Sequence, residues 1–222
     1  MPATKMDIIA AAQEPTAFAL DRFGAVMKAA RYTGPQVWLY KSHLIDNAVA
    51  FHAPARHDPQ ALIPVIAYNP WFMTTVDFAA DSKFATMAVL AHELGHIRNG
   101  HDLDPYSYPP DLELQADHYS GFVLARLKAS PHQAALVHRL IFAIHGPNVL
   151  QECATHPDLF RRFEAVQRGW RDGGGRASVK ELRRALDRIP YELARWHFTC
   201  APPPPADPRA RGRLVRRARP RN

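Results

Sequence analysis

Residues 92–96 of this 222-residue chain read His-Glu-Leu-Gly-His, and no other feature of the sequence restricts the fold as strongly. Histidines four residues apart lie one turn apart on the same face of an α-helix, so both rings can bind a single metal ion. Glu93 follows the first histidine and can take a proton from a water molecule bound to that metal. The chemistry therefore requires a helix here. The apolar spacing from Ser82 to about Asn99, with Gly100 as a stop signal, predicts one.

A zinc site also needs a third protein ligand and an open position for water. The chain lacks the continuation HExxHxxGxxH, because Asn99 and Asp102 stand where that pattern needs Gly and His. Glu113 and Asp117 are instead four residues apart on a helix predicted from 111 to about 127, and the small Ala116 between them would let the two helices approach closely. One carboxylate can bind the metal while the other accepts a ring N–H from a ligating histidine. Because glutamate has the longer reach, we expect Glu113 to be the ligand and Asp117 the hydrogen-bond partner. The expected site holds one Zn²⁺ per chain between His92, His96 and Glu113.

The rest of the chain predicts a mixture of short strands and helices. Runs rich in β-branched and aromatic residues predict a small sheet early in the chain, with strands at 36–40, 47–52 and 62–68 and a loop at 54–60. Pro64 favours an edge position for the third strand, because proline cannot donate a hydrogen bond to a neighbouring strand. Further helices are expected at 5–31 with a break near Pro15, 131–145, 157–170 and 178–198.

The net charge of +7 comes almost entirely from the C-terminal end. Residues 201–222 contain seven arginines and one aspartate, whereas the preceding 200 residues are close to neutral at +1. We expect this tail to be disordered and able to contact anionic surfaces. It lacks interleaved aromatic residues for stacking on bases, so we predict no specific nucleic-acid binding. The chain has no apolar run of membrane-spanning length and no secretory signal, which favours a cytoplasmic location and leaves open a peripheral contact with a membrane.

Four motifs, in order along the chain, resemble the M48 zinc metallopeptidases, the family that includes the CAAX-processing proteases. They are DNAVA at 46–50, AHELGHIRNGH at 91–101, ELQADHYSGFVL at 113–124, and His156-Pro157 followed by Arg162. The resemblance covers roughly residues 36–170 and is closest to the compact, soluble bacterial members of the family. It implies a gluzincin-type site in which His92, His96 and Glu113 bind zinc and Glu93 is the catalytic base. It also implies that His156 and Arg162 lie near the scissile carbonyl.

The expected fold is therefore α+β and zincin-like, with a small sheet packed on the HExxH helix and further helices completing the site. Residues 1–170 would form the zinc metallopeptidase domain. Residues 171–200 would be a linker and a C-terminal helix, and residues 201–222 the disordered tail.

The expected function is that of a zinc-dependent endopeptidase acting on a protein or peptide substrate. His156 or Arg162 would stabilise the oxyanion, and the strand at 62–68 would pair with an extended substrate. A zinc-containing binding or adaptor protein is one alternative, although a structural zinc site would not need Glu93. An ImmA/IrrE-type regulatory peptidase is another, since that family also pairs HExxH with a downstream acidic helix. Asn47-Ala48 and His156-Pro157 favour the M48 family over it. The sequence does not indicate the substrate, the regulation or the oligomeric state.

Overall fold

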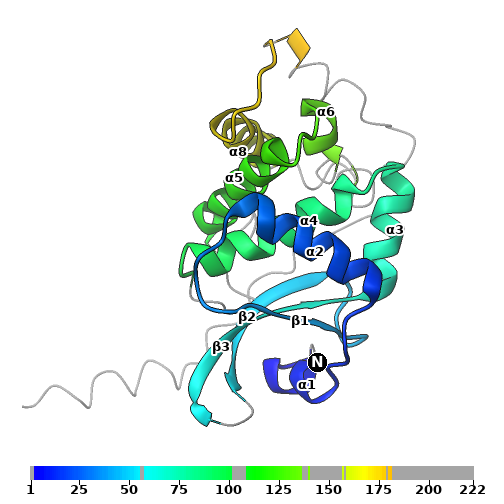
Figure 1. The fold of residues 1–222 in the computed structure, drawn as a ribbon, viewed down its shortest axis with the longest axis vertical. Helices are drawn as coiled ribbons and strands as arrows, with labels where there is room; N and C mark the ends of the chain where they lie inside the picture. Colours follow the sequence, from blue (N-terminus) through cyan, green and yellow to red (C-terminus); the bar gives the residue numbers. More distant parts are fainter. Residues whose placement is uncertain are drawn as a thin grey trace, which may run out of the picture.

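The computed structural model describes residues 3–55, 58–101, 109–136, 140, 157, 159–178, 180 and 181. Its fold is mixed α+β, as predicted: a small sheet lies between the short helix α1 on one side and a layer of longer helices on the other (Figure 1). His156, the tail at 201–222 and most of the helices predicted at 131–145 and 178–198 lie outside the described residues.

The sheet has the strand order β1-β3-β2, formed by Trp38–Lys41, Asp58–Tyr68 and Ala48–Ala55. β1 runs parallel to β3, and β2 and β3 form an antiparallel hairpin. The outer side of β1 is partly covered, because the backbone of Gln13 exchanges two hydrogen bonds with Lys41, each 3.0 Å long. The expected sheet early in the chain is therefore confirmed.

The prediction that the third strand lies at an edge is wrong, because β3 is the central strand. Pro64 is nevertheless compatible with this position. β1 pairs only with Val65 to Tyr68, so at Pro64 the strand has a neighbour on one side only, where it lies opposite His52. The predicted loop at 54–60 was also too long, since β2 continues to Ala55 and β3 begins at Asp58.

The helices account for most of the remaining described chain. Their bounds are Lys5–Ala10 for α1, Ala17–Ala30 for α2, Pro70–Ala80 for α3, Phe84–Arg98 for α4, Pro110–Arg126 for α5, Pro131–Ala134 for α6 and Leu159–Asp172 for α8. The expected break near Pro15 is confirmed, with Thr16 capping α2 through its side-chain oxygen. α3 was not predicted. Asn69 caps it by accepting hydrogen bonds from the backbone of Trp71 and Phe72.

α4 is the central helix of the molecule. It is buried on almost every side, between the sheet, α2, α3 and α5 (Figure 1). Its apolar residues belong to the main core together with the sheet residues Val65, Ile66 and Phe51. A helix in this position has little freedom to shift, so side chains that project from it are held precisely.

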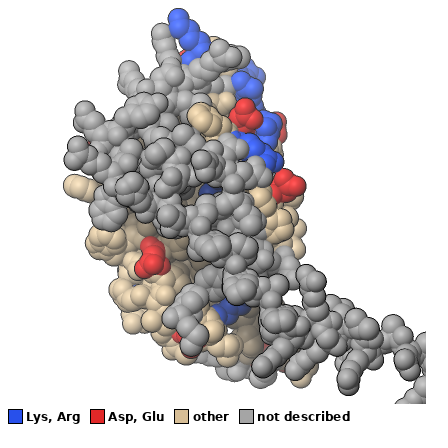
Figure 2. Space-filling view, turned by 180° about the vertical axis from the view of Figure 1, so that it is seen from behind, with Lys and Arg blue, Asp and Glu red and all other residues tan. Residues whose placement is uncertain are grey.

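Basic and acidic side chains of the described residues lie close together on one face of the molecule (Figure 2). On the face opposite to that in Figure 1, basic and acidic residues lie side by side along one border and do not form a patch of one sign (Figure 2). Two ion pairs of α8 show the pattern: Arg161 pairs with Asp111 of α5, and Arg168 pairs with Glu164 of α8 itself. Among the described residues, no helix is both long enough and apolar enough to cross a membrane.

α5 and α8 pack closely because each presents a glycine to the backbone of the other. A Cβ atom at Gly121 would overlap the carbonyl oxygen of Val166, and one at Gly169 would overlap the carbonyl oxygen of His118. Neither neighbour is a flexible side-chain end, so the helices would have to separate to accommodate a larger residue.

We therefore expect Gly121→Ala to lower the free energy of unfolding by about 2–3 kcal/mol, as overpacking does in tight cores. Gly24→Ala is the matched control, because Gly24 lies in α2 with nothing within 4 Å of its added Cβ. There alanine should stabilise by about 0.5–1 kcal/mol through helix propensity. Urea unfolding measures both effects. If both substitutions changed the free energy of unfolding in the same direction, the close packing of α5 on α8 would be contradicted.

Candidate metal centre

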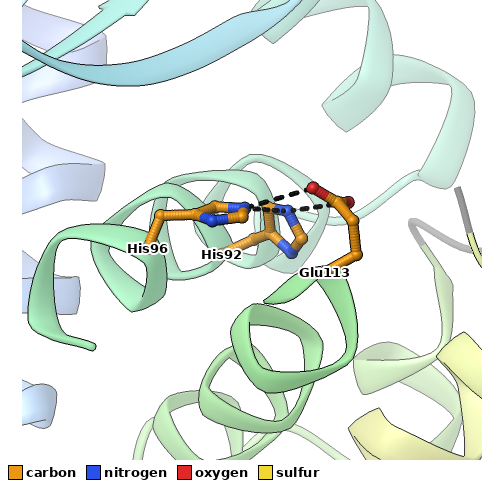
Figure 3. A group of neighbouring side chains, drawn as sticks. All are labelled: His92, His96 and Glu113. Carbon is orange, nitrogen blue, oxygen red and sulfur yellow. Dashed lines mark hydrogen bonds and ion pairs between the residues drawn. The ribbon is translucent and has the colours of Figure 1, made fainter. Parts of the chain in front are cut away.

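Two histidines of α4 and one glutamate of α5 bring their ligand atoms together in the interior of the protein. His92 Nε2 lies 3.1 Å from His96 Nε2 and 3.5 Å from Glu113 Oε2, and His96 Nε2 lies 3.4 Å from Glu113 Oε1. In Figure 3 both rings face the Glu113 carboxylate, which reaches over from α5. The ligand atoms of the three residues lie within 4.8 Å of one another, so the group could hold a metal ion.

The close approach of α4 and α5 makes this geometry possible. Gly95 faces Ala116, and a Cβ at Gly95 would lie 3.1 Å from the Cα and 3.2 Å from the carbonyl oxygen of Ala116. The expectation that the small Ala116 lets the helices approach closely is thus confirmed. A hydrogen bond also joins the two helices, because the hydroxyl of Ser120 donates to the carbonyl of Ala88 at 2.9 Å.

The second nitrogen of His92 is held by Asp117. His92 Nδ1 donates to Asp117 Oδ1 at 2.9 Å, which leaves Nε2 facing the ligand group. Arg162 of α8 approaches the same carboxylate from behind, with its Nε donating to Oδ2 at 2.7 Å and its Nη2 to Oδ1 at 2.9 Å. Nη2 also lies 3.3 Å from Glu113 Oε2. Arg162 therefore connects the two carboxylates of α5.

Without a metal, the site binds a proton on one histidine and excludes it from the other. Burial disfavours the His92 cation, but hydrogen bonds and negative charge from Asp117 and Glu113 outweigh burial and raise its pKa to about 10. Burial lowers the pKa of His96 to about 4, only partly offset by Glu113. Although burial opposes it, contact with both histidines keeps the pKa of Glu113 well below its usual value. The metal-free site thus combines a His92 cation with a Glu113 anion at neutral pH.

Glu93 is a buried carboxylate beside the ligand group. Burial raises its pKa to about 7, against the opposing effect of His92. The carboxylate accepts a hydrogen bond from the backbone N–H of Ala50 in β2, which ties it to the sheet. A carboxylate that titrates near neutral pH can both accept and return a proton under physiological conditions.

A further histidine and a glutamine extend the site on the far side of His96. His101 Nδ1 lies 2.9 Å from His96 Nδ1, and His101 Nε2 lies 3.2 Å from the side-chain oxygen of Gln115. Gln115 was not predicted to have a role, and His101 was considered only as an alternative third ligand in case neither Glu113 nor Asp117 binds the metal. The available signal was Gly100, which ends α4 and turns the chain back over its last turn.

The structure places the predicted residues as follows. His92, His96 and Glu113 come together, with Asp117 behind His92 and Glu93 in the adjacent position on α4. Arg162 joins the group, but the contacts that the structure records for its Nε and Nη2 are with the two carboxylates. His156 lies outside the described residues.

Comparisons with family models, curated proteins and solved structures find no match to this chain. The relationship to M48 peptidases therefore stays a prediction from sequence motifs.

The pKa of His92 predicts a pH-dependent metal affinity. Below about pH 10 the metal-free His92 carries a proton that metal binding must displace. Affinity for Zn²⁺, used as the probe ion, should therefore rise about tenfold per pH unit over the neutral range. Competition with a chromogenic chelator measures this slope. Glu93→Gln removes the other group that titrates near pH 7 and should leave the slope of zinc affinity against pH unchanged. If zinc affinity in that variant does not depend on pH, His92 is neutral in the metal-free protein.

Glu113 and Asp117 are expected to differ in their effect on metal binding. Glu113→Ala removes a ligand and should abolish tight binding of the probe ion, while Asp117→Ala removes the partner of His92 and should weaken binding by about 10–100-fold. Asp111→Ala, in the exposed first turn of the same helix, is the matched control. Because Asp117 also pairs with Arg162, thermal unfolding should accompany the metal titration. If Asp117→Ala abolishes binding and Glu113→Ala keeps it, the two roles are reversed.

Proposed function

We propose that the chain is a zinc-dependent endopeptidase of the M48 type. The observation that carries the proposal is the triangle formed by His92, His96 and Glu113. Zinc bonds of about 2.0–2.1 Å in a tetrahedron place neighbouring ligand atoms about 3.3–3.4 Å apart. The Nε2 atoms of His92 and His96 lie 3.1 Å apart, close to that spacing, and each lies near a different oxygen of Glu113, at 3.5 Å from Oε2 and 3.4 Å from Oε1. Taken as one ligand atom per residue, the three atoms lie within 4.8 Å of one another. Two histidines and one carboxylate also form a ligand set typical of catalytic zinc sites, which keep their fourth position open.

Zinc, when bound, would lower the pKa of water and polarise the substrate carbonyl. Glu93 would accept the proton of the attacking water and pass it to the amine that leaves when the peptide bond breaks. A pKa of about 7 suits both steps, and the hydrogen bond from Ala50 keeps the carboxylate oriented. A zinc site with only a structural role would need no buried carboxylate at this position.

The position of Ala50 also indicates where a peptide substrate would lie. Its N–H is directed to Glu93 and therefore away from β3, so the outer edge of β2 runs past the proposed base. This edge replaces the strand at 62–68 as the proposed partner of an extended substrate, since β3 is paired on both sides over Val65 to Tyr68. Backbone hydrogen bonds to the β2 edge would hold the scissile bond beside Glu93.

Arg162 has a different proposed role from the one expected at the outset. Its Nε and Nη2 donate to Asp117, and Nη2 also lies near Glu113, so we assign it to holding these carboxylates in place. Stabilisation of the oxyanion then falls to His156 as the other residue proposed from the sequence.

The proposal predicts that Glu93→Gln retains zinc but loses hydrolysis, because the three ligands remain and the base is gone. We expect at least a 100-fold decrease in kcat with zinc content unchanged. A peptide-library digest followed by kinetics on the best substrate measures the activity, and metal analysis measures the zinc. Glu164→Gln is the matched control, since Glu164 is an exposed residue of α8 whose carboxylate lies 3.9 Å from Arg168 on the same helix.

Equal cleavage by wild type and Glu93→Gln would refute the proposed mechanism. Zinc binding without cleavage in the wild type would favour a zinc-containing binding or adaptor protein.

A further inference from the structure

The end of helix α4 brings a histidine back against one of the metal-binding residues. Gly100 has a φ of +65°, the left-handed conformation that glycine adopts readily at a helix end. The N–H of Gly100 donates to the carbonyl of Ile97, and the N–H of His101 donates to the carbonyl of His96. In this type of helix end, the residue after the glycine contacts the third residue from the helix terminus. That contact is usually apolar, but here it joins two histidine rings.

The two rings meet through their nitrogen atoms. The centroids of His96 and His101 lie 5.0 Å apart with the ring planes at 73°, so the rings are not stacked. His101 is buried, and Gln115 of α5 reaches its other nitrogen. The ring of His96 thus stands between His101 and the ligand group, which excludes His101 as a ligand of the same ion.

A contact of 2.9 Å between two ring nitrogens requires one hydrogen atom between them. Since His101 Nε2 donates to the Gln115 oxygen, a neutral His101 has an unprotonated Nδ1 that must accept the hydrogen bond. His96 then carries its hydrogen on Nδ1, and the lone pair of its Nε2 faces Glu113 and His92, where it accepts a hydrogen bond from His92 Nε2 at 3.1 Å.

We propose that His101 and Gln115 form a positioning relay that holds His96 in the one tautomer able to bind a metal through Nε2. This inference rests on the metal site in the proposed function. The relay matters because the opposite tautomer of His96 can also form a hydrogen bond within the site. A hydrogen on His96 Nε2 could be donated to Glu113 Oε1, which lies 3.4 Å away. Asp117 does the equivalent work for His92 with a charged acceptor, whereas the relay uses neutral groups.

The first test compares three substitutions of His101. His101→Phe keeps a ring but removes the acceptor, so zinc affinity should decrease by about 10–100-fold. His101→Asn keeps an acceptor near the position of Nδ1 and should restore most of the affinity. His118→Phe is the control, because His118 is a histidine of α5 that pairs with Asp172 at 2.7 Å away from the site. If His101→Asn loses as much affinity as His101→Phe, the ring contributes packing only and the relay is refuted.

The second test uses the exposed Gln115, where substitution carries little risk to folding. Gln115→Glu offers only acceptors to His101 and should maintain or raise zinc affinity. Gln115→Lys offers only donors, which favours the wrong tautomer of His101, and should lower zinc affinity. Equal affinities in both variants would contradict the relay.

Nitrogen-15 NMR of the histidines in the metal-free protein separates this inference from the proposed function. Wild-type His96 should be protonated on Nδ1 and should lose this preference in His101→Phe, whether or not the protein is a peptidase. If wild type binds no zinc but shows this tautomer, the relay stands and the zinc proposal fails. If wild type binds zinc and His96 carries its hydrogen on Nε2 in the metal-free protein, the relay fails and the zinc proposal stands.

Discussion

The close approach of α4 and α5 at Gly95 and Ala116 is the constraint on which the candidate metal centre depends. A carboxylate and two imidazoles meet at 3.1–3.5 Å only because no side chain separates the two helix backbones at that point. α4 is itself fixed by the sheet and by the helices around it. The positions of His92, His96 and Glu113 are therefore set by the packing of the two helix backbones.

The electrostatics of the site are balanced by a helix that supplies no ligand. Glu113 and Asp117 are both buried, which would be costly without a nearby positive charge. Arg162 of α8 provides that charge, and in the metal-free protein the proton on His92 adds to it. A proton on His92 therefore supplies positive charge beside the two carboxylates where a bound metal ion would otherwise supply it.

Spacing in the sequence was sufficient to predict which residues share a face. Histidines at 92 and 96, and carboxylates at 113 and 117, could be placed on two facing helices because helical periodicity is local. Strand order is not local, and the edge position inferred from Pro64 failed because β1 pairs only beyond that residue. α3 escaped prediction because its exposed Trp71 and Phe78 obscure the apolar stripe. The link from His96 to Gln115 depends on a helix end and a second helix meeting in space, which no single stretch of sequence encodes.

The glycine contact between α5 and α8 has a consequence for saturation mutagenesis. Arg162 reaches Asp117 from α8 only while that helix lies directly on α5, and Gly121 and Gly169 set the separation. A screen that scores loss of the proposed activity would therefore rank these two glycines with the three proposed metal ligands. Their signature would differ in one respect. Every side chain would be rejected there, including alanine, whereas the ligand positions would tolerate the few residues that can still donate a lone pair.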